Sequence, residues 1–169
     1  TGDQASFDAI EMSSGVPVIC SHGGVRALAN SPRNLSDEMV EAIAKTGGVV
    51  GTPAISDFLV RGKEMAHMPE SPLGTVDNFI AHVEHVMNLV GPDHVGLGTD
   101  FTTGQSIIRD RALFGPETLD EGPRRFVRGF EDVSELPNVV RALEEREWPE
   151  EHVQKFLGGN WLRGYEQGW

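Results

Sequence analysis

Apolar residues recur along this chain in two alternating patterns, one of short continuous runs and one of longer, evenly spaced stretches. The short runs carry no polar face, which is typical of strands buried on both sides in a parallel sheet. The strongest spaced stretch, Thr75 to Leu89, has apolar residues at three- and four-residue steps and predicts an amphipathic helix. The predicted strands are Val16–Cys20, Val49–Thr52 and His94–Gly98.

Capping residues and glycines set the limits of the other predicted helices. Asp3 is placed to cap a helix near the start of the chain, and Ser36 is a good N-cap for the next one. Gly47-Gly48 stops that second helix. These helices cover 3–13 and 36–46, and two more are predicted over about 135–147 and 149–158.

Strands that alternate with amphipathic helices predict an α/β fold, with a parallel sheet covered by helices. Three strands do not close a (β/α)₈ barrel, which typically needs about 250 residues. The 169 residues therefore predict either a small open sheet or a barrel of which a part is missing. A predicted loop over about 102–134 is long enough to be either functional or poorly ordered.

The charge balance and the single cysteine narrow the partners and the compartment. With 26 acidic against 14 basic residues, the net charge of −12 repels phosphate backbones and anionic lipid, so we expect neither nucleic acid nor a membrane as a partner. Cys20 cannot form an intrachain disulfide, which favours a reducing, cytoplasmic location. The chain begins at Thr1 with no initiator methionine or signal peptide, so we expect a fragment or a processed product.

Two polar side chains follow predicted strands at the ends where ligands gather in parallel α/β folds. His22 comes after the first strand, in a turn with two glycines, and Asp100 follows the third strand. Histidine is a common zinc ligand, and aspartate can act as a ligand, a base or an orienting group. The alternative for each is a purely structural bond to the backbone.

An arginine and a pair of histidines are further candidates. The guanidinium of Arg33, in the loop before the second helix, could clamp a carboxylate with two hydrogen bonds. Spacing alone favours the alternative, a surface arginine paired with Asp37 or Glu38. His82 and His85 share a helix face, but they do not form an HExxH motif, and their mid-helix position favours packing roles.

Longer stretches of the sequence agree with one known family of enzymes. They are Pro17–His22, Arg26–Leu28, Pro32–Glu38, His82–Val86, Gly91–Phe101, Phe130–Val133 and Gly159–Arg163. In this order they resemble the membrane (renal) dipeptidase family of zinc metallopeptidases, in its C-terminal half, over nearly the whole chain. The Ser-His…Pro-Arg-Asn and Gly-x-Gly-[ST]-Asp-Phe pieces are the most specific.

The resemblance implies that residues 1–169 are the C-terminal portion of a single (β/α)₈ barrel domain with two zinc ions at its C-terminal face. It implies that His22 ligates one zinc ion, that Arg33 holds the carboxylate of a dipeptide substrate, and that Asp100 is catalytic and handles protons beside the metals. The implied reaction is dipeptide hydrolysis by a hydroxide that bridges the two zinc ions.

The same resemblance places most of the metal ligands outside this sequence. The family's His-x-Asp, its bridging Glu and another site His belong to the upstream half, and a further ligand His would directly precede Thr1. We therefore expect at most one zinc ligand from this chain and the upstream half as a required partner; a homodimer is a further hypothesis. Two alternatives stay open: an inactive α/β fragment or binding module, and another metal-dependent amidohydrolase on the same barrel.

Overall fold

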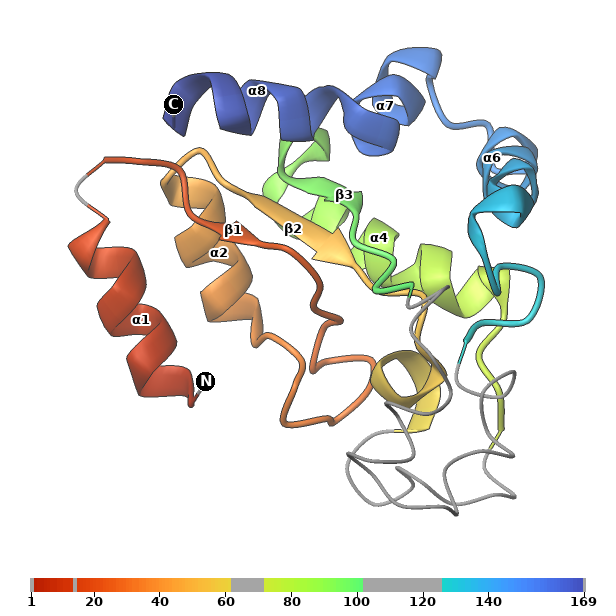
Figure 1. Cartoon of the computed structure of the whole chain (residues 1–169), viewed down its shortest axis with the longest axis horizontal. Helices are drawn as coiled ribbons and strands as arrows, with labels where there is room; N and C mark the ends of the chain where they lie inside the picture. The colour runs from red at the N-terminus through yellow and green to blue at the C-terminus, as the bar shows by residue number, and fades with distance from the viewer. Residues whose placement is uncertain (1, 14, 62–71, 102–125, 169) are drawn as a thin grey trace, which may run out of the picture.

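A three-stranded parallel sheet lies at the centre of the protein in the computed structural model, which describes residues 2–13, 15–61, 72–101 and 126–168 (Figure 1). The strands lie in the order β1-β2-β3, and Val50 of β2 lies opposite Val95 of β3. They are β1 (Ile19–Cys20), β2 (Val49–Thr52) and β3 (Val95–Leu97). This arrangement confirms the predicted α/β fold with about three parallel strands.

Helices precede, connect and follow the strands. The α-helices are α1 (Asp3–Met12), α2 (Asp37–Lys45), α4 (Val76–Val90), α6 (Leu136–Glu145), α7 (Glu150–Gln154) and α8 (Asn160–Gly168). Two π-helices are η1 (Asp57–Arg61) and η5 (Lys155–Gly159), and two 3₁₀ helices are η2 (Pro92–His94) and η4 (Val133–Glu135). The predicted helices are confirmed, whereas η1 and α8 were not predicted.

Local capping explains most of the helix limits. The Ser36 side chain accepts a hydrogen bond from Met39 N at the start of α2, as predicted. Gly91, with φ of 92°, ends α4 in a conformation that suits glycine. The predicted cap at Asp3 is wrong, because Gly2 is the N-cap of α1 and Asp3 is its first helical residue. The Asp3 carboxylate is instead bound by Arg26, in the loop between β1 and α2.

The core fills the space between the sheet and its helices. Val50 and Val95 have no more than 1% of their surface exposed, as do Phe79 and Ile80 on α4. The Phe79 ring packs edge-to-face on Phe130, with centroids 5.4 Å apart. The apolar stripe predicted for α4 therefore faces the core and packs against the sheet.

The last helix, α8, packs across β2 and β3 (Figure 1), with the Trp161 ring against Gly51 and Gly96. Asn160 donates two hydrogen bonds, to Pro92 O at 2.7 Å and Val95 O at 2.8 Å. Arg163 donates to Gly47 O at 2.8 Å and to Asp93 O at 2.5 Å. Because these carbonyls lie at or before the start of β2 and β3, the helix holds this end of the sheet together.

The long predicted loop over 102–134 is only partly described. Residues 102–125 lie outside the described residues, whereas 126–134 form isolated bridges and the helix η4. In one of these bridges Phe126 pairs with Ile55. Among the helices of the described ranges, none is long and apolar enough to span a lipid bilayer.

Candidate active site

His22 lies just beyond the C-terminal end of β1. Gly23 N donates a 2.8 Å hydrogen bond to Gly51 O of β2, and this bond fixes the turn that carries the imidazole. The Nδ1 atom lies 2.9 Å from Ser21 Oγ. In the tautomer in which Nδ1–H donates to Ser21, Nε2 keeps its lone pair, as a zinc-ligating histidine requires.

Asp100 lies beyond the C-terminal end of β3 on an anchored piece of backbone. Gly98 N donates to Thr52 O at 3.1 Å, and Ala54 N donates to Thr99 O at 3.0 Å. Asp100 has φ of 56°, a left-handed conformation that aspartate tolerates better than most residues. The backbone therefore turns sharply at Asp100.

Phe101 fixes the far side of that turn. Its ring packs edge-to-face on Phe126, with centroids 5.4 Å apart, and on Phe130, at 5.0 Å. Aromatic pairs in this geometry add stabilisation beyond their buried area. The Asp100 backbone is thus held between the strand on one side and an aromatic cluster on the other.

Glycines let the ends of β1 and β3 come together over β2. A Cβ added at Gly98 or Gly51 would overlap the carbonyl oxygen of Ser21. Only glycine allows so close an approach. His22 directly follows Ser21, and Asp100 lies two residues after Gly98, so both leave the sheet at its C-terminal edge.

Arg33 lies in the loop between β1 and α2, and its side chain is exposed. The guanidinium carbon lies 5.2 Å from the centre of the Phe58 ring, in a cation–π contact. Arg33 pairs with neither Asp37 nor Glu38: the Asp37 carboxylate binds His85 Nε2 at 2.8 Å, and the Glu38 carboxylate binds the Ser36 side chain. The guanidinium therefore lies over the Phe58 ring.

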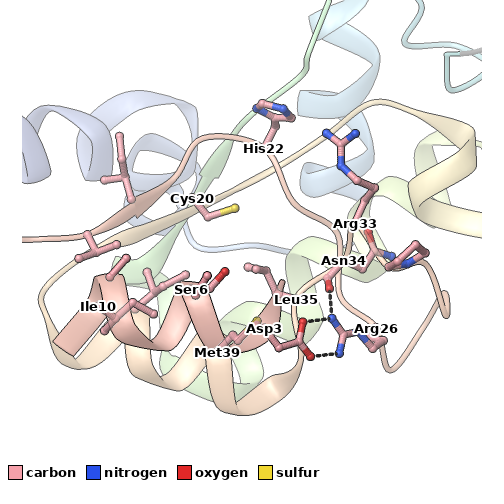
Figure 2. A pocket seen from close by; sticks show the side chains of 16 residues that line it. Asp3, Ser6, Ile10, Cys20, His22, Arg26, Arg33, Asn34, Leu35 and Met39 are labelled. Atoms are coloured by element: carbon pink, nitrogen blue, oxygen red, sulfur yellow. Dashed lines mark hydrogen bonds and ion pairs between the residues drawn. The ribbon is translucent and has the colours of Figure 1, made fainter. Parts of the chain in front are cut away.

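A cavity of about 490 Å³ lies between α1, β1, α2 and the loop that joins β1 to α2 (Figure 2). Its wall includes His22 and Arg33, whose charged or polar ends extend to the same side in Figure 2. Asp3 and Arg26 lie on its other side, where Arg26 Nη1 and Nη2 bind the two carboxylate oxygens at 2.7 and 3.0 Å. This hydrogen-bonded ion pair lowers the pKa of Asp3.

Arg26 also connects to the loop that carries Arg33. Its Nη2 donates to Asn34 O at 2.8 Å, so one guanidinium joins α1 to the residue after Arg33. The sequence pattern did not point to this role, because Asp3 and Arg26 lie 23 positions apart and no spacing rule relates them. The side chain of Arg26 is 28% exposed, which places the ion pair at the surface.

The donor groups that the fold brings together include one candidate metal ligand, His22. No group of three or more His, Cys, Asp or Glu side chains suited to a metal ion forms within the described residues. His22 fits as one imidazole ligand, because its turn is fixed and Ser21 can accept from Nδ1. A zinc centre that includes His22 would need further ligands.

His82 has the structural role that its mid-helix position predicted. It is 1% exposed; its Nδ1 accepts from Val25 N and its Nε2 donates to Leu59 O, both at 3.0 Å. Burial lowers the pKa of His82 to about 4, so the ring is neutral at physiological pH. It ties the loop after β1 to η1 beneath the candidate site.

Comparison with known proteins identifies the family of this chain. The family model of membrane dipeptidase, peptidase family M19, matches residues 1–110 and 118–167. The chain belongs to this family. The strand-end residues His22 and Asp100 and the loop residue Arg33 all lie within the matched ranges.

Individual relatives of this M19 chain agree with the assignment. It is 33% identical to dipeptidase tcpJ of Claviceps purpurea over 161 residues, which are 95% of this chain and 31% of that protein. A solved amidohydrolase from Pseudomonas aeruginosa has 33% identity and a TM-score of 0.79, covering 99% of this chain and 50% of the other. The solved dipeptidase AC, a metallo peptidase, has 26% identity and a TM-score of 0.74, covering 96% and 41%.

The shares of each chain show how much of the fold is present. The chain spans about a third of the length of the fungal dipeptidase and half of the length of the Pseudomonas structure. Its three strands and flanking helices thus correspond to a portion of a larger barrel-like fold, as predicted.

Proposed function

We propose that this chain contributes part of the active site of a zinc-dependent dipeptidase. The observation that carries the proposal is the meeting of the β1 and β3 ends, which brings His22 and Asp100 to one edge of the sheet in a member of peptidase family M19. Active sites of parallel β/α barrels lie at this edge.

In this proposal His22 ligates zinc through Nε2 and Asp100 exchanges protons with the reacting groups. Zinc ions held there would supply an activated water and polarise the scissile carbonyl. Asp100 is suited to its role because its backbone is anchored on both sides, which limits movement of the carboxyl group. No group of three or more side chains that could ligate a metal ion forms within the described residues. In this proposal the upstream half supplies the remaining ligands.

Arg33 would select the length of the substrate. Its guanidinium can bind a terminal carboxylate with two parallel hydrogen bonds, which a Lys ammonium cannot do in the same plane. A longer peptide has an uncharged amide at that position and would leave the guanidinium without its partner. This preference for a free carboxylate limits the substrate to peptides with one residue after the scissile bond, such as a dipeptide.

The first experiment measures Ala-Ala hydrolysis by the complete enzyme, by its Arg33→Ala variant and by the 169-residue chain alone. We expect Arg33→Ala to raise KM at least about tenfold with zinc content unchanged, because a charge-assisted contact is lost. The isolated chain should be inactive. An unchanged KM would contradict the carboxylate clamp, and an active isolated chain would contradict the need for an upstream half.

A broader amidohydrolase activity is the second candidate, since one solved structure at 33% identity is described as an amidohydrolase. The complete enzyme should be tested with dipeptides, cyclic amides and lactones at equal concentrations. We expect dipeptides to react fastest because only they present a free carboxylate beside the scissile amide. Faster turnover of a cyclic amide or lactone would favour the second candidate.

A further inference from the structure

We infer that Phe58 is a positioning residue, which holds the Arg33 guanidinium in the orientation that binds a substrate carboxylate. The inference rests on the proposed function, because it assumes that Arg33 binds that carboxylate. The guanidinium carbon lies 5.2 Å from the centre of the Phe58 ring. Phe58 belongs to η1, an element that the sequence pattern did not predict.

The backbone at Phe58 is anchored to the core. Phe58 N donates to Ile55 O at 3.0 Å, within the turn that leads into η1. The next residue, Leu59, is 3% exposed, and its carbonyl accepts from buried His82 Nε2 at 3.0 Å. The ring therefore projects from a backbone that is fixed to both the core and α4.

The loop that carries Arg33 is fixed to the same backbone. The Asn34 side chain is buried, at 2% exposure, and its Nδ2 donates to Phe58 O at 2.7 Å and to Ala29 O at 2.8 Å. A Cβ added at Gly24 would lie 2.7 Å from Asn34 Oδ1 and 3.0 Å from Phe58 O, so these groups are closely packed. Residues 33 and 58 are thus held at a constant separation.

A guanidinium that stacks on an aromatic ring keeps its N–H edge for a carboxylate. An aromatic ring contacts the planar face of the group, whereas a carboxylate binds to its N–H edge. The Arg33 side chain is exposed and would otherwise sample many rotamers, and each substrate molecule would have to restrict them. The Phe58 ring restricts them beforehand, so it favours substrates with a free carboxylate.

The test compares a dipeptide with its C-terminal amide, which lacks the carboxylate, as substrates for the complete enzyme. The selectivity is the ratio of the two kcat/KM values. Phe58→Leu removes the aromatic face but keeps the backbone carbonyl that Asn34 binds. We expect this variant to lower the selectivity about threefold, through KM for the dipeptide, since an exposed cation–π contact is weak. Phe58→Tyr keeps the face and should restore it.

The Arg33→Ala variant separates the two hypotheses in the same experiment. If Arg33→Ala lowers the selectivity at least about tenfold and Phe58→Leu leaves it unchanged, the positioning role is wrong while the carboxylate clamp stands. If Arg33→Ala leaves the selectivity unchanged, the clamp itself is wrong. A loss of selectivity in Phe58→Tyr equal to that in Phe58→Leu would also overturn the role of the aromatic face.

Discussion

Two sets of polar side chains, one at each end of the sheet, are engaged in different ways. At the N-terminal end, Asn160, Arg163 and His94 donate to backbone carbonyls, with five hydrogen bonds of 2.5 to 2.8 Å. At the C-terminal end, His22 contacts the hydroxyl of its neighbour Ser21, and Arg33 lies exposed over a ring. The first group is committed to the backbone, whereas the second keeps donors and acceptors for a ligand.

This difference indicates that two sequence motifs of the family have different roles, one in stability and one in catalysis. The Gly159–Arg163 stretch joins α8 to the starts of β2 and β3, so its loss should damage stability. The stretches around His22 and Asp100 place groups at the edge where barrel enzymes carry out chemistry, so their loss should damage activity. The predictions below test this division between the two ends.

The largest effect is expected at Asp100. Asp100→Asn keeps the side-chain shape and tolerates the left-handed backbone, but it removes the ionisable group. We expect kcat to fall by about 10²–10⁴-fold with zinc content unchanged, the range for loss of a general acid or base. Steady-state kinetics and metal analysis of the complete enzyme check this. A kcat within about twofold of that of the unmodified enzyme would remove Asp100 from the mechanism.

A large loss of stability is expected at the other end, in Asn160→Ala. This change removes two hydrogen bonds and leaves buried carbonyls unpaired, so the free energy of unfolding should fall by about 3 kcal/mol. Urea denaturation measures it, with kcat/KM expected to stay close to that of the unmodified enzyme. Asn138→Ala, which removes one bond to Gly129 O at 3.0 Å, is the matched control and should cost about 1 kcal/mol.

Acid should destabilise the fold through His82. The pKa of His82 is about 4 in the folded state, against the ordinary histidine value of 6.5 in the unfolded chain. The unfolded state therefore binds a proton first, so this contribution is fully present above pH 6.5 and is lost as the pH falls towards 4, with a total of roughly 3 kcal/mol. Urea denaturation at pH 7 and pH 4.5 should show this loss, and His82→Gln should lack it. An equal pH dependence in both proteins would contradict the assignment.

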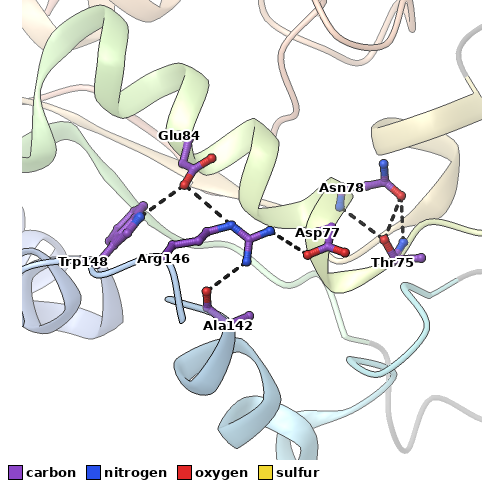
Figure 3. Close-up of polar contacts among 7 residues, drawn as sticks. All are labelled: Thr75, Asp77, Asn78, Glu84, Ala142, Arg146 and Trp148. Atoms are coloured by element: carbon purple, nitrogen blue, oxygen red, sulfur yellow. Dashed lines mark hydrogen bonds and ion pairs between the residues drawn. The ribbon is translucent and has the colours of Figure 1, made fainter. Parts of the chain in front are cut away.

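The smallest effect compares two arginines in similar surroundings. Arg146 binds Asp77 at 2.6 Å and Ala142 O at 2.9 Å (Figure 3), much as Arg26 binds Asp3 at 2.7 Å and Asn34 O at 2.8 Å. Their side chains are 30% and 28% exposed. Each alanine variant should lose at most about 1 kcal/mol of stability.

Only Arg26→Ala should change catalysis, because Arg26 holds the residue next to Arg33. We expect KM for a dipeptide to rise about threefold in this variant, the effect of one weakened hydrogen bond. Arg146→Ala should leave KM unchanged. Equal KM values for both variants would show that the position of the Arg33 loop does not depend on Arg26.

The sequence predicted the structural features that depend on residues close together along the chain. Regular apolar spacing identified α4, and Ser36 identified the start of α2, since both signals act within one or two helical turns. The strand ends with His22 and Asp100 were found for the same reason. The helix α8 was missed because the predicted final helix stopped at residue 158, whereas the α8 residues bond to strands about 65 positions away.

The candidate site was predictable only in part, for a related reason. Arg33 was recognised from its motif, but the Phe58 ring lies 25 positions later in η1, which was not predicted. The bond between Asp3 and Arg26 likewise joins α1 to the loop between β1 and α2. Such contacts follow from the packing of distant segments, which no local pattern records.

The most direct test of the division between the two ends replaces one histidine at each. His22 lies at the C-terminal end of β1, and His94 lies before β3, where its Nδ1 donates to Gly48 O at 2.8 Å. Zinc affinity and kcat/KM for Ala-Ala are measured in the complete enzyme with His22→Ala and with His94→Ala. We expect His22→Ala to lose more than about tenfold in both quantities, and His94→Ala to keep both while losing about 1 kcal/mol of stability. Full zinc binding and activity in His22→Ala, or an equal loss in His94→Ala, would contradict the assignment of the C-terminal edge as the active site.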